Sequence, residues 1–289
     1  MKVGLVPAFA GGVVASGTDA GAFVRAVETN GFESLWVGEH IVLPVHQRVA
    51  YPGAREGLSA PSDAPLPDPL EWLAFVAGRS DTLLLGTAIL LATLHHPLTL
   101  AKRVATLDQL SGGRVRLGVG IGWNEQEYEA VSVPFAHRGA RLEEYLAALR
   151  VLWREDQAEF AGTFVRFEPV YSSPKPVGGS VPILIGGNSE AAARRAGRIG
   201  DGYFPFERDQ DRLTSLVTVM RRAATDAGRD PDTIEITSLG STRPDSVTRL
   251  VQLGVQRMIV FLPGSDVAAV DAIGDRCRSA GADMTGPAS

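Results

Sequence analysis

The chain has little cysteine, no basic run and no long apolar run, and each absence excludes a class of protein. Cys277 is the single cysteine of 289 residues, which excludes an intramolecular disulfide and a metal cage built from cysteines. The formal net charge is −5 and Lys and Arg form no cluster, which argues against nucleic acid and anionic membranes as partners. No segment offers about twenty uninterrupted apolar residues, and the N-terminal residues do not resemble a signal peptide. We therefore expect a cytoplasmic protein that acts on a small molecule.

The composition, with 45% hydrophobic and 21% charged residues, is typical of a globular protein with a large core. Short apolar runs rich in β-formers alternate with longer segments of helical periodicity, the pattern of parallel βα units. The runs cover 2–8, 34–38, 83–89, 114–120, 181–186, 201–205, 233–239 and 256–262. The helical segments cover 19–30, 69–79, 97–110, 137–154, 188–198, 209–227, 244–253 and 266–280. Eight such units predict a (β/α)₈ TIM barrel of the α/β class, with the whole chain 1–289 as one domain.

Two connections are longer than the rest. The segment 44–68, after the second expected strand, is rich in Pro and Gly, so neither a helix nor a central strand can run through it. It would rise from the C-terminal face of the barrel, where a lid over a pocket belongs. The segment 155–180, between the fourth helix and the fifth strand, alternates polar and apolar residues before a Pro/Gly stretch. We expect a small hairpin there.

Four clusters of polar or glycine residues follow expected strands, and in a barrel all four face one rim. They are Glu39-His40, Thr87-Ala88-Ile89, Gly120-Ile121-Gly122-Trp123-Asn124 and Gly186-Gly187-Asn188-Ser189. His40 is the candidate for acid/base catalysis, because imidazole titrates near neutral pH and Glu39 could tune it. The alternative is a histidine that only forms a hydrogen bond in the pocket wall. His95 and His96 point in different directions in an extended segment, which argues against a shared metal.

The glycine clusters each allow two interpretations. Gly118, Gly120 and Gly122 follow a strand as in the dinucleotide motif GxGxxG, but Trp123 stands where a small residue is needed, which disfavours a Rossmann dehydrogenase. These glycines either admit a flat ring close to the backbone or relieve crowding where the strand leaves the barrel. Gly186 and Gly187 precede a helix with Asn188 or Ser189 as N-cap, and this turn either presents amides to a cofactor phosphate or is an ordinary capped helix.

Taken together, these segments resemble the luciferase-like monooxygenase superfamily, and within it the coenzyme F420-dependent oxidoreductases. The resemblance covers nearly the whole chain. It is carried by GFESLWVGEH at 31–40, PLPDPLEWLA at 65–74, LGTAILLATLHHPLTLAKRVATLDQLSGGRVRLGVGIGWNEQEY at 85–128, VPFAHRGARLEEYL at 133–146, FAGTFVRFEPVYSSPKP at 160–176 and VPILIGGNSEAAARRAGRIGDGYFP at 181–205.

The resemblance implies a deazaflavin across the barrel mouth. Its phosphate would lie near Gly186, Gly187, Asn188 and Ser189, and its ring near Glu39, Thr87, Ala88, Ile89, Gly122 and Asn124. A cis peptide between Ala88 and Ile89 is expected, because the family has a bulge there. The family often dimerises, so the resemblance also implies a homodimer.

The resemblance also bears on the reaction. His40 matches a family histidine implicated in proton transfer in members that dehydrogenate sugar phosphates, and Glu39 stands where those members have Asp. Trp123 stands in the substrate pocket where they have Glu, so their substrate is not transferred to this chain. Hydride transfer between F420 and an unidentified small substrate is the leading hypothesis. Two alternatives stay open: a two-component monooxygenase that uses FMN on the same fold, and a non-catalytic binding protein.

Overall fold

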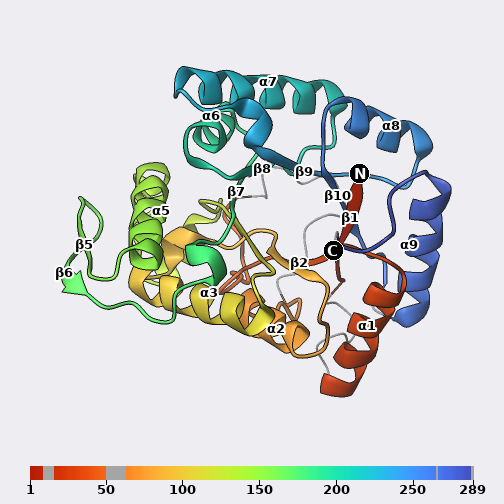
Figure 1. The fold of residues 1–289 in the computed structure, drawn as a ribbon, viewed down its shortest axis with the longest axis horizontal. Coiled ribbons are helices and arrows are strands. Elements are labelled where there is room, and N and C mark those ends of the chain that lie inside the picture. Colours follow the sequence, from red (N-terminus) through yellow and green to blue (C-terminus); the bar gives the residue numbers. More distant parts are fainter. Residues whose placement is uncertain (9–15, 50–62, 265, 288–289) are drawn as a thin grey trace.

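The computed structural model describes residues 1–8, 16–49, 63–264 and 266–287. Eight parallel strands close into a barrel in the order β1-β10-β9-β8-β7-β4-β3-β2 (Figure 1). They are β1 (Lys2–Val6), β2 (Ser34–Val37), β3 (Leu84–Thr87), β4 (Val115–Val119), β7 (Ile183–Gly186), β8 (Gly202–Phe204), β9 (Glu235–Leu239) and β10 (Arg257–Phe261). The predicted (β/α)₈ barrel is confirmed, because every expected strand and no other described strand forms its wall.

Helices surround the barrel (Figure 1), and they begin and end close to the predicted limits. They are α1 (Gly17–Thr29), α2 (Pro69–Ala77), α3 (Pro97–Ser111), α5 (Arg138–Arg154), α6 (Glu190–Ile199), α7 (Gln210–Asp226), α8 (Pro244–Gln252) and α9 (Val267–Ser279). One helix was missed by the sequence prediction: α4 (Glu125–Ala130), a short element between β4 and α5. It carries a residue of the candidate site.

The two long connections differ in what the structure describes. The predicted hairpin is confirmed: β5 (Ala158–Ala161) and β6 (Arg166–Val170) pair antiparallel outside the barrel. Of the predicted lid at 44–68, residues 50–62 lie outside the described part of the chain. The backbone amide of Arg48, just before them, donates to Gln126 Oε1 over 2.8 Å, so the segment that enters this connection lies against α4.

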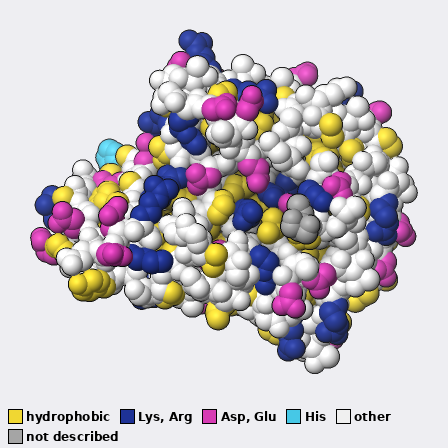
Figure 2. Space-filling view, viewed as in Figure 1, with side chains coloured by type: hydrophobic (Ala, Val, Ile, Leu, Met, Phe, Trp, Pro, Cys, Tyr) yellow, Lys and Arg dark blue, Asp and Glu magenta, His cyan; other side chains and the backbone are white. Residues whose placement is uncertain are grey.

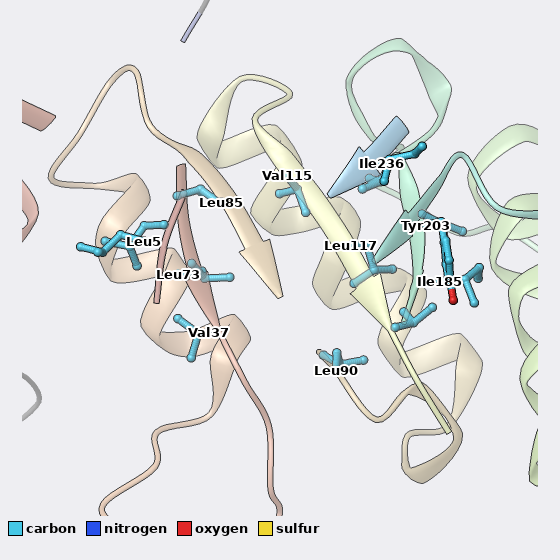
Figure 3. Close-up of a cluster of buried hydrophobic side chains, with 14 of the residues drawn as sticks. Leu5, Val37, Leu73, Leu85, Leu90, Val115, Leu117, Ile185, Tyr203 and Ile236 are labelled. Atoms are coloured by element: carbon cyan, nitrogen blue, oxygen red, sulfur yellow. The ribbon is translucent and has the colours of Figure 1, made fainter. Parts of the chain in front are cut away.

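The wall of the barrel separates two hydrophobic clusters because successive side chains of a strand point to opposite faces. Side chains that point outward pack under the helices, as Figure 3 shows for Leu73 of α2 beside Val37 and Leu85. Side chains that point inward fill the barrel itself. The inner cluster contains Val6, Trp36, Leu184, Phe204, Leu239 and Ile259, with Ala88, Ile89 and Phe206 packed against it.

Trp36 fills the middle of the barrel, and glycines on the two neighbouring strands leave room for it. A Cβ added at Gly86 of β3 would lie 2.2 Å from the Trp36 ring, and one at Gly4 of β1 would lie 2.6 Å from its Nε1. The indole Nε1 donates to Ser34 Oγ over 2.7 Å. The barrel is therefore a packed core at this level rather than a channel.

A buried ionic network lies next to this indole, around Arg257. The Arg257 guanidinium lies 5.4 Å from the centre of the Trp36 ring and forms ion pairs with Glu33 and Glu235. Burial alone would lower the pKa of Arg257, but these two carboxylates hold it above its ordinary value. Both carboxylates precede or begin strands, so the network joins the N-terminal ends of β2, β9 and β10.

The face of the molecule in Figure 2 shows no large patch of side chains with one sign of charge among the described residues. On that face, Lys and Arg side chains are interspersed with Asp and Glu, and hydrophobic side chains lie between them. Among the described residues, no helix combines the length and the apolar character needed to cross a bilayer.

We predict that Gly86→Ala destabilises the fold by about 1 to 3 kcal/mol, because the new methyl group overlaps the Trp36 ring. Urea denaturation measures the loss. Gly78→Ala is the matched control, since φ is −81° there and the nearest atom to an added Cβ is 3.7 Å away. The effects of Gly86→Ala and Trp36→Phe should not add, because both act on one contact. Equal midpoints for Gly86→Ala and Gly78→Ala would contradict this account of the core.

Candidate active site

The four predicted clusters lie side by side on one rim. They follow β2, β3, β4 and β7, which are consecutive neighbours in the barrel. Since all eight strands are parallel, their C-terminal ends meet at the same mouth. Segments more than 140 residues apart in the chain, such as Glu39-His40 and Gly186-Gly187, thus come to one side of this mouth.

His40 pairs with a carboxylate that the sequence analysis did not assign. Its Nδ1 lies 3.0 Å from Glu127 Oε2, and Glu127 Oε1 accepts the backbone amide of Ile41 over 2.7 Å. The Glu127 side chain is 1% exposed and the His40 side chain 23%. An ionised carboxylate only accepts hydrogen bonds. With Glu127 ionised, His40 Nδ1 therefore carries a proton and donates it to Glu127 Oε2. His40 Nε2 has no hydrogen-bond partner among the described residues and is the nitrogen left for chemistry.

The prediction that Glu39 tunes His40 is wrong. Glu39 Oε1 lies 2.8 Å from His95 Nε2, and Glu39 Oε2 accepts the amide of Leu91 over 2.6 Å. Neighbours in an extended segment point to opposite sides, so the side chains of Glu39 and His40 diverge. Glu39 is 6% exposed as a residue, and both of its oxygens hold the turn after β3. His95 orders the rim through this pair.

The cis peptide between Ala88 and Ile89 is present, as the resemblance implied. The Ile89 side chain lies over glycines of the two next strands. An added Cβ would lie 2.0 Å from Ile89 Cδ1 at Gly120 and 2.9 Å from Ile89 Cγ2 at Gly186, while at Gly118 it would meet the Thr87 carbonyl oxygen. The structure therefore supports the crowding interpretation for these glycines. We call this space, formed by Gly118, Gly120 and Gly186, the glycine notch.

Thr87 and Gly122, two further residues of the predicted cofactor-binding set, have structural roles in the rim. Thr87 is fully buried, and its hydroxyl donates to the Gly118 carbonyl over 2.6 Å, so the side chain faces the next strand rather than the mouth. Gly122 has a φ of +64°, a left-handed conformation that favours glycine and turns the chain from β4 into α4. Trp123, next in the chain, meets the His40 ring edge to face at 6.2 Å and 83°.

Two asparagines in loops of the rim each have a buried polar atom without a partner among the described residues. Asn124 caps α4 through Oδ1, while its Nδ2 is buried and donates to no described group. Asn188 donates through Nδ2 to the Phe206 carbonyl over 2.7 Å, while its Oδ1 is buried and accepts from no described group. One unused donor and one unused acceptor are therefore present. A buried polar atom without a partner lowers the stability of the fold unless a ligand or a water molecule forms a hydrogen bond with it.

The turn after β7 offers backbone amides to an anion. Among the described residues, no hydrogen bond comes from the amides of Gly187, Asn188 or Ser189. Ser189 caps α6 by accepting the amide of Ala192. Gly187 has a φ of +121°, which L side chains rarely adopt, and its carbonyl accepts the hydroxyl of Tyr203. The three amides at the N-terminus of α6 form what we call the amide cradle.

The sequence analysis missed Glu127, although the sequence carries a signal for the helix that bears it. Asn124 and Glu127 have the spacing of an N-cap and third helical residue. It also missed Arg212, whose guanidinium donates to the carbonyl of Asn188 over 2.9 Å at the amide cradle and pairs with Glu207. Among the described residues, no group of three or more His, Cys, Asp or Glu lies together as a metal site would require.

With this geometry in place, comparison with known proteins identifies the family. The profile of the luciferase-like monooxygenase family matches residues 3–245. The chain belongs to this family. It is 36% identical over 261 residues to the uncharacterized protein Rv0953c of Mycobacterium tuberculosis, covering 89% of this chain and 90% of that protein. It is 33% identical over 217 residues to an F420-dependent glucose-6-phosphate dehydrogenase of Mycobacterium tuberculosis, covering 73% of this chain and 60% of that enzyme.

Solved structures share the fold at low identity. The F420-dependent tetrahydromethanopterin reductase of Methanopyrus kandleri superposes with a TM-score of 0.76 at 16% identity, covering 96% of this chain and 98% of that one. The oxygenating constituent of 3,6-diketocamphane monooxygenase from Pseudomonas putida, in complex with FMN, gives a TM-score of 0.67 at 20% identity, covering 87% and 71%. These similarities show the fold of the family.

We predict that Glu127→Leu destabilises the protein by about 1 to 3 kcal/mol, because the amide of Ile41 loses its acceptor. Glu127→Gln keeps an acceptor oxygen and should lose less. Glu129→Gln, on the same helix, is the control: its carboxylate forms an exposed pair with Arg48 and should change the free energy of unfolding by less than about 1 kcal/mol. Urea titration measures all three. Similar losses for Glu127→Leu and Glu129→Gln would mean that Glu127 does not anchor this turn.

Proposed function

We propose that this chain is an F420-dependent oxidoreductase that moves a hydride between F420 and a small organic substrate at the barrel mouth, with His40 moving the matching proton. The observation that carries the proposal is the His40 and Glu127 pair. A buried carboxylate fixes one nitrogen of a partly exposed imidazole and leaves the other without a hydrogen-bond partner among the described residues. Such an arrangement is typical of a general acid or base.

The residues around this pair fit a deazaflavin. The pyrimidine edge of such a ring alternates hydrogen-bond donors and acceptors, which complements the unused Asn124 Nδ2 and Asn188 Oδ1. The amide cradle at the N-terminus of α6 suits the phosphate, since backbone N–H groups and the helix dipole both favour an anion. Relatives named as F420-dependent enzymes support the choice of cofactor.

When bound, F420 supplies the two-electron hydride chemistry. The protein supplies orientation and proton transfer. Hydride that leaves or reaches a polarised substrate carbon is matched by one proton that leaves or reaches the attached heteroatom, and His40 Nε2 accepts or returns that proton. Glu127 orients the ring and stabilises the imidazolium when Nε2 is protonated, because the carboxylate lies 3.0 Å from Nδ1. Trp123 packs edge to face with the His40 ring and closes the site beside it.

A monooxygenase that uses reduced FMN is the second candidate. The observation that favours it is the structural similarity to an FMN-bound monooxygenase constituent. FMN also carries a ring with a pyrimidine edge and a phosphate, so the amide cradle and the two asparagines suit it as well.

We predict that F420 binds with a lower Kd than FMN when each is titrated anaerobically and followed by fluorescence. Asn188→Leu, which removes the unused acceptor and the bond to the Phe206 carbonyl, should weaken F420 binding by about tenfold or more. Tighter binding of FMN, with oxygen consumption upon addition of reduced FMN and a substrate, would overturn the F420 assignment in favour of the monooxygenase.

We predict that His40→Ala lowers kcat by about 10² to 10⁴ while the Kd of F420 changes little, because a positioned general acid or base contributes on that scale. Glu127→Gln should lower kcat by a smaller factor, since the ring remains but its orientation and charge stabilisation weaken. His96→Ala is the control, because His96 is exposed and forms no side-chain cap on α3. Loss of F420 affinity with kcat retained at saturation would show that His40 positions the cofactor ring instead.

A further inference from the structure

A second polar pocket opens on the same rim, beyond the four clusters. It has a volume of about 310 Å³ and lies where β9 ends at Leu239. It is lined by Arg208, Gln210, Leu239, Gly240, Ser241, Arg243, Asp245, Ser246 and Arg249. These residues come from three segments: the loop after β8 with the first residue of α7, the end of β9 with the turn after it, and helix α8. We call it the arginine pocket.

The arginine pocket gathers positive charge in a chain whose net charge is −5. Arg208, Arg243 and Arg249 line it, and none of their guanidinium groups forms an ion pair with a described residue. Asp245 is its one carboxylate, so the lining carries a net charge of about +2 at neutral pH. Three exposed arginines with one carboxylate among them leave an excess of positive charge, and a bound oxyanion would reduce the repulsion between the arginines.

The backbone adds donors to the same pocket. Arg243 is the N-cap of α8 and makes no side-chain cap, and since Pro244 has no N–H and Ser246 donates to the Arg243 carbonyl, the amide of Asp245 is left for another acceptor. Among the described residues, no hydrogen bond comes from the amides of Ser241, Thr242 or Asp245. Ser241 Oγ is also buried and has no described hydrogen-bond partner. Guanidinium, amide and hydroxyl groups thus converge, and all of them can donate to an oxyanion.

The arginine pocket and the amide cradle are lined by different residues, although they share the segment after β8: Phe206 and Arg212 contact Asn188, whereas Arg208 lines the pocket. In barrel order, β9 is three strands from β2, which carries His40, and two strands from β7, which leads into the amide cradle. A cofactor phosphate held by the backbone amides of the cradle does not use the side chains that line the arginine pocket. A molecule that reaches His40 from the open mouth can place a second group over β9, because both lie on one rim.

We propose that the arginine pocket binds a doubly charged oxyanion group, such as a phosphate ester, of the substrate. This inference rests on the proposed function only in taking the ligand as the substrate of the F420 reaction. The net charge of the lining favours a dianion over a single carboxylate. The pocket then sets the substrate class, and His40 sets the chemistry.

Calorimetric titration of the full chain with inorganic phosphate at about pH 8, where it is a dianion, tests the proposal. We expect saturable binding that is tighter than the binding of acetate. The double variant Arg243→Gln/Arg249→Gln should raise the Kd for phosphate by about tenfold or more, since hydrogen bonds to charged groups are lost. Arg194→Gln/Arg222→Gln is the matched control, because both side chains are exposed on other helices. Equal phosphate affinity in the two double variants would overturn the proposal.

A second titration separates the substrate from the cofactor as the source of the anion. Loading with F420 should remove only phosphate that binds at the amide cradle and keep the phosphate binding that depends on Arg243 and Arg249, and Arg243→Gln/Arg249→Gln should leave the Kd for F420 unchanged. If F420 displaces phosphate and the variant weakens F420 binding, the arginine pocket belongs to the cofactor and the proposal is overturned. If F420 binds neither protein while the variant still loses phosphate, the proposed function fails and the oxyanion site stands.

Discussion

The packing of Ile89 into the glycine notch is the contact on which the geometry of the rim depends. Ile89 ends the turn after β3, yet its side chain lies over Gly120 and Gly186 of the next two strands. A larger residue at either glycine would push this turn away from the wall. Glu39 holds the same turn from the other side through the amide of Leu91. The floor of the mouth at the ends of β3, β4 and β7 is therefore set by close packing, which tolerates little displacement.

Two carboxylate and histidine pairs lie at this rim, and the nitrogen that each histidine uses decides its role. His95 binds Glu39 through Nε2 and is 14% exposed, and the carboxylate is fully occupied by the ring and an amide. His40 binds Glu127 through Nδ1 and is more exposed, so Nε2 at the tip of the ring remains accessible. The first pair fixes the backbone, and the second leaves one ring nitrogen without a partner among the described residues.

The sequence predicted the barrel and the rim because both follow from local patterns. Alternating apolar runs identify strands, and parallel strands bring their C-terminal residues together. Glu127 could not be paired with His40 in this way, because 87 residues separate them and the contact depends on how α4 folds back. The alternation that separates His95 from His96 also separates Glu39 from His40. The arginine pocket joins three segments, and no local pattern shows that Arg208 lies beside Arg243 and Arg249.

The positions of the three sites around the mouth show how substrate specificity can vary between proteins of this fold. The His40 pair, the amide cradle and the arginine pocket follow different strands, and the segment after β8 contacts the cradle through Arg212 and lines the pocket through Arg208. Substitutions in the turn after β9 or in α8 alter the charge that meets a ligand without disturbing the glycine notch or the pair around His40. Substitutions at Gly120 or Gly186 move the shared floor and affect every ligand. Specificity is therefore free to vary in the loops, whereas the strand ends are constrained by packing.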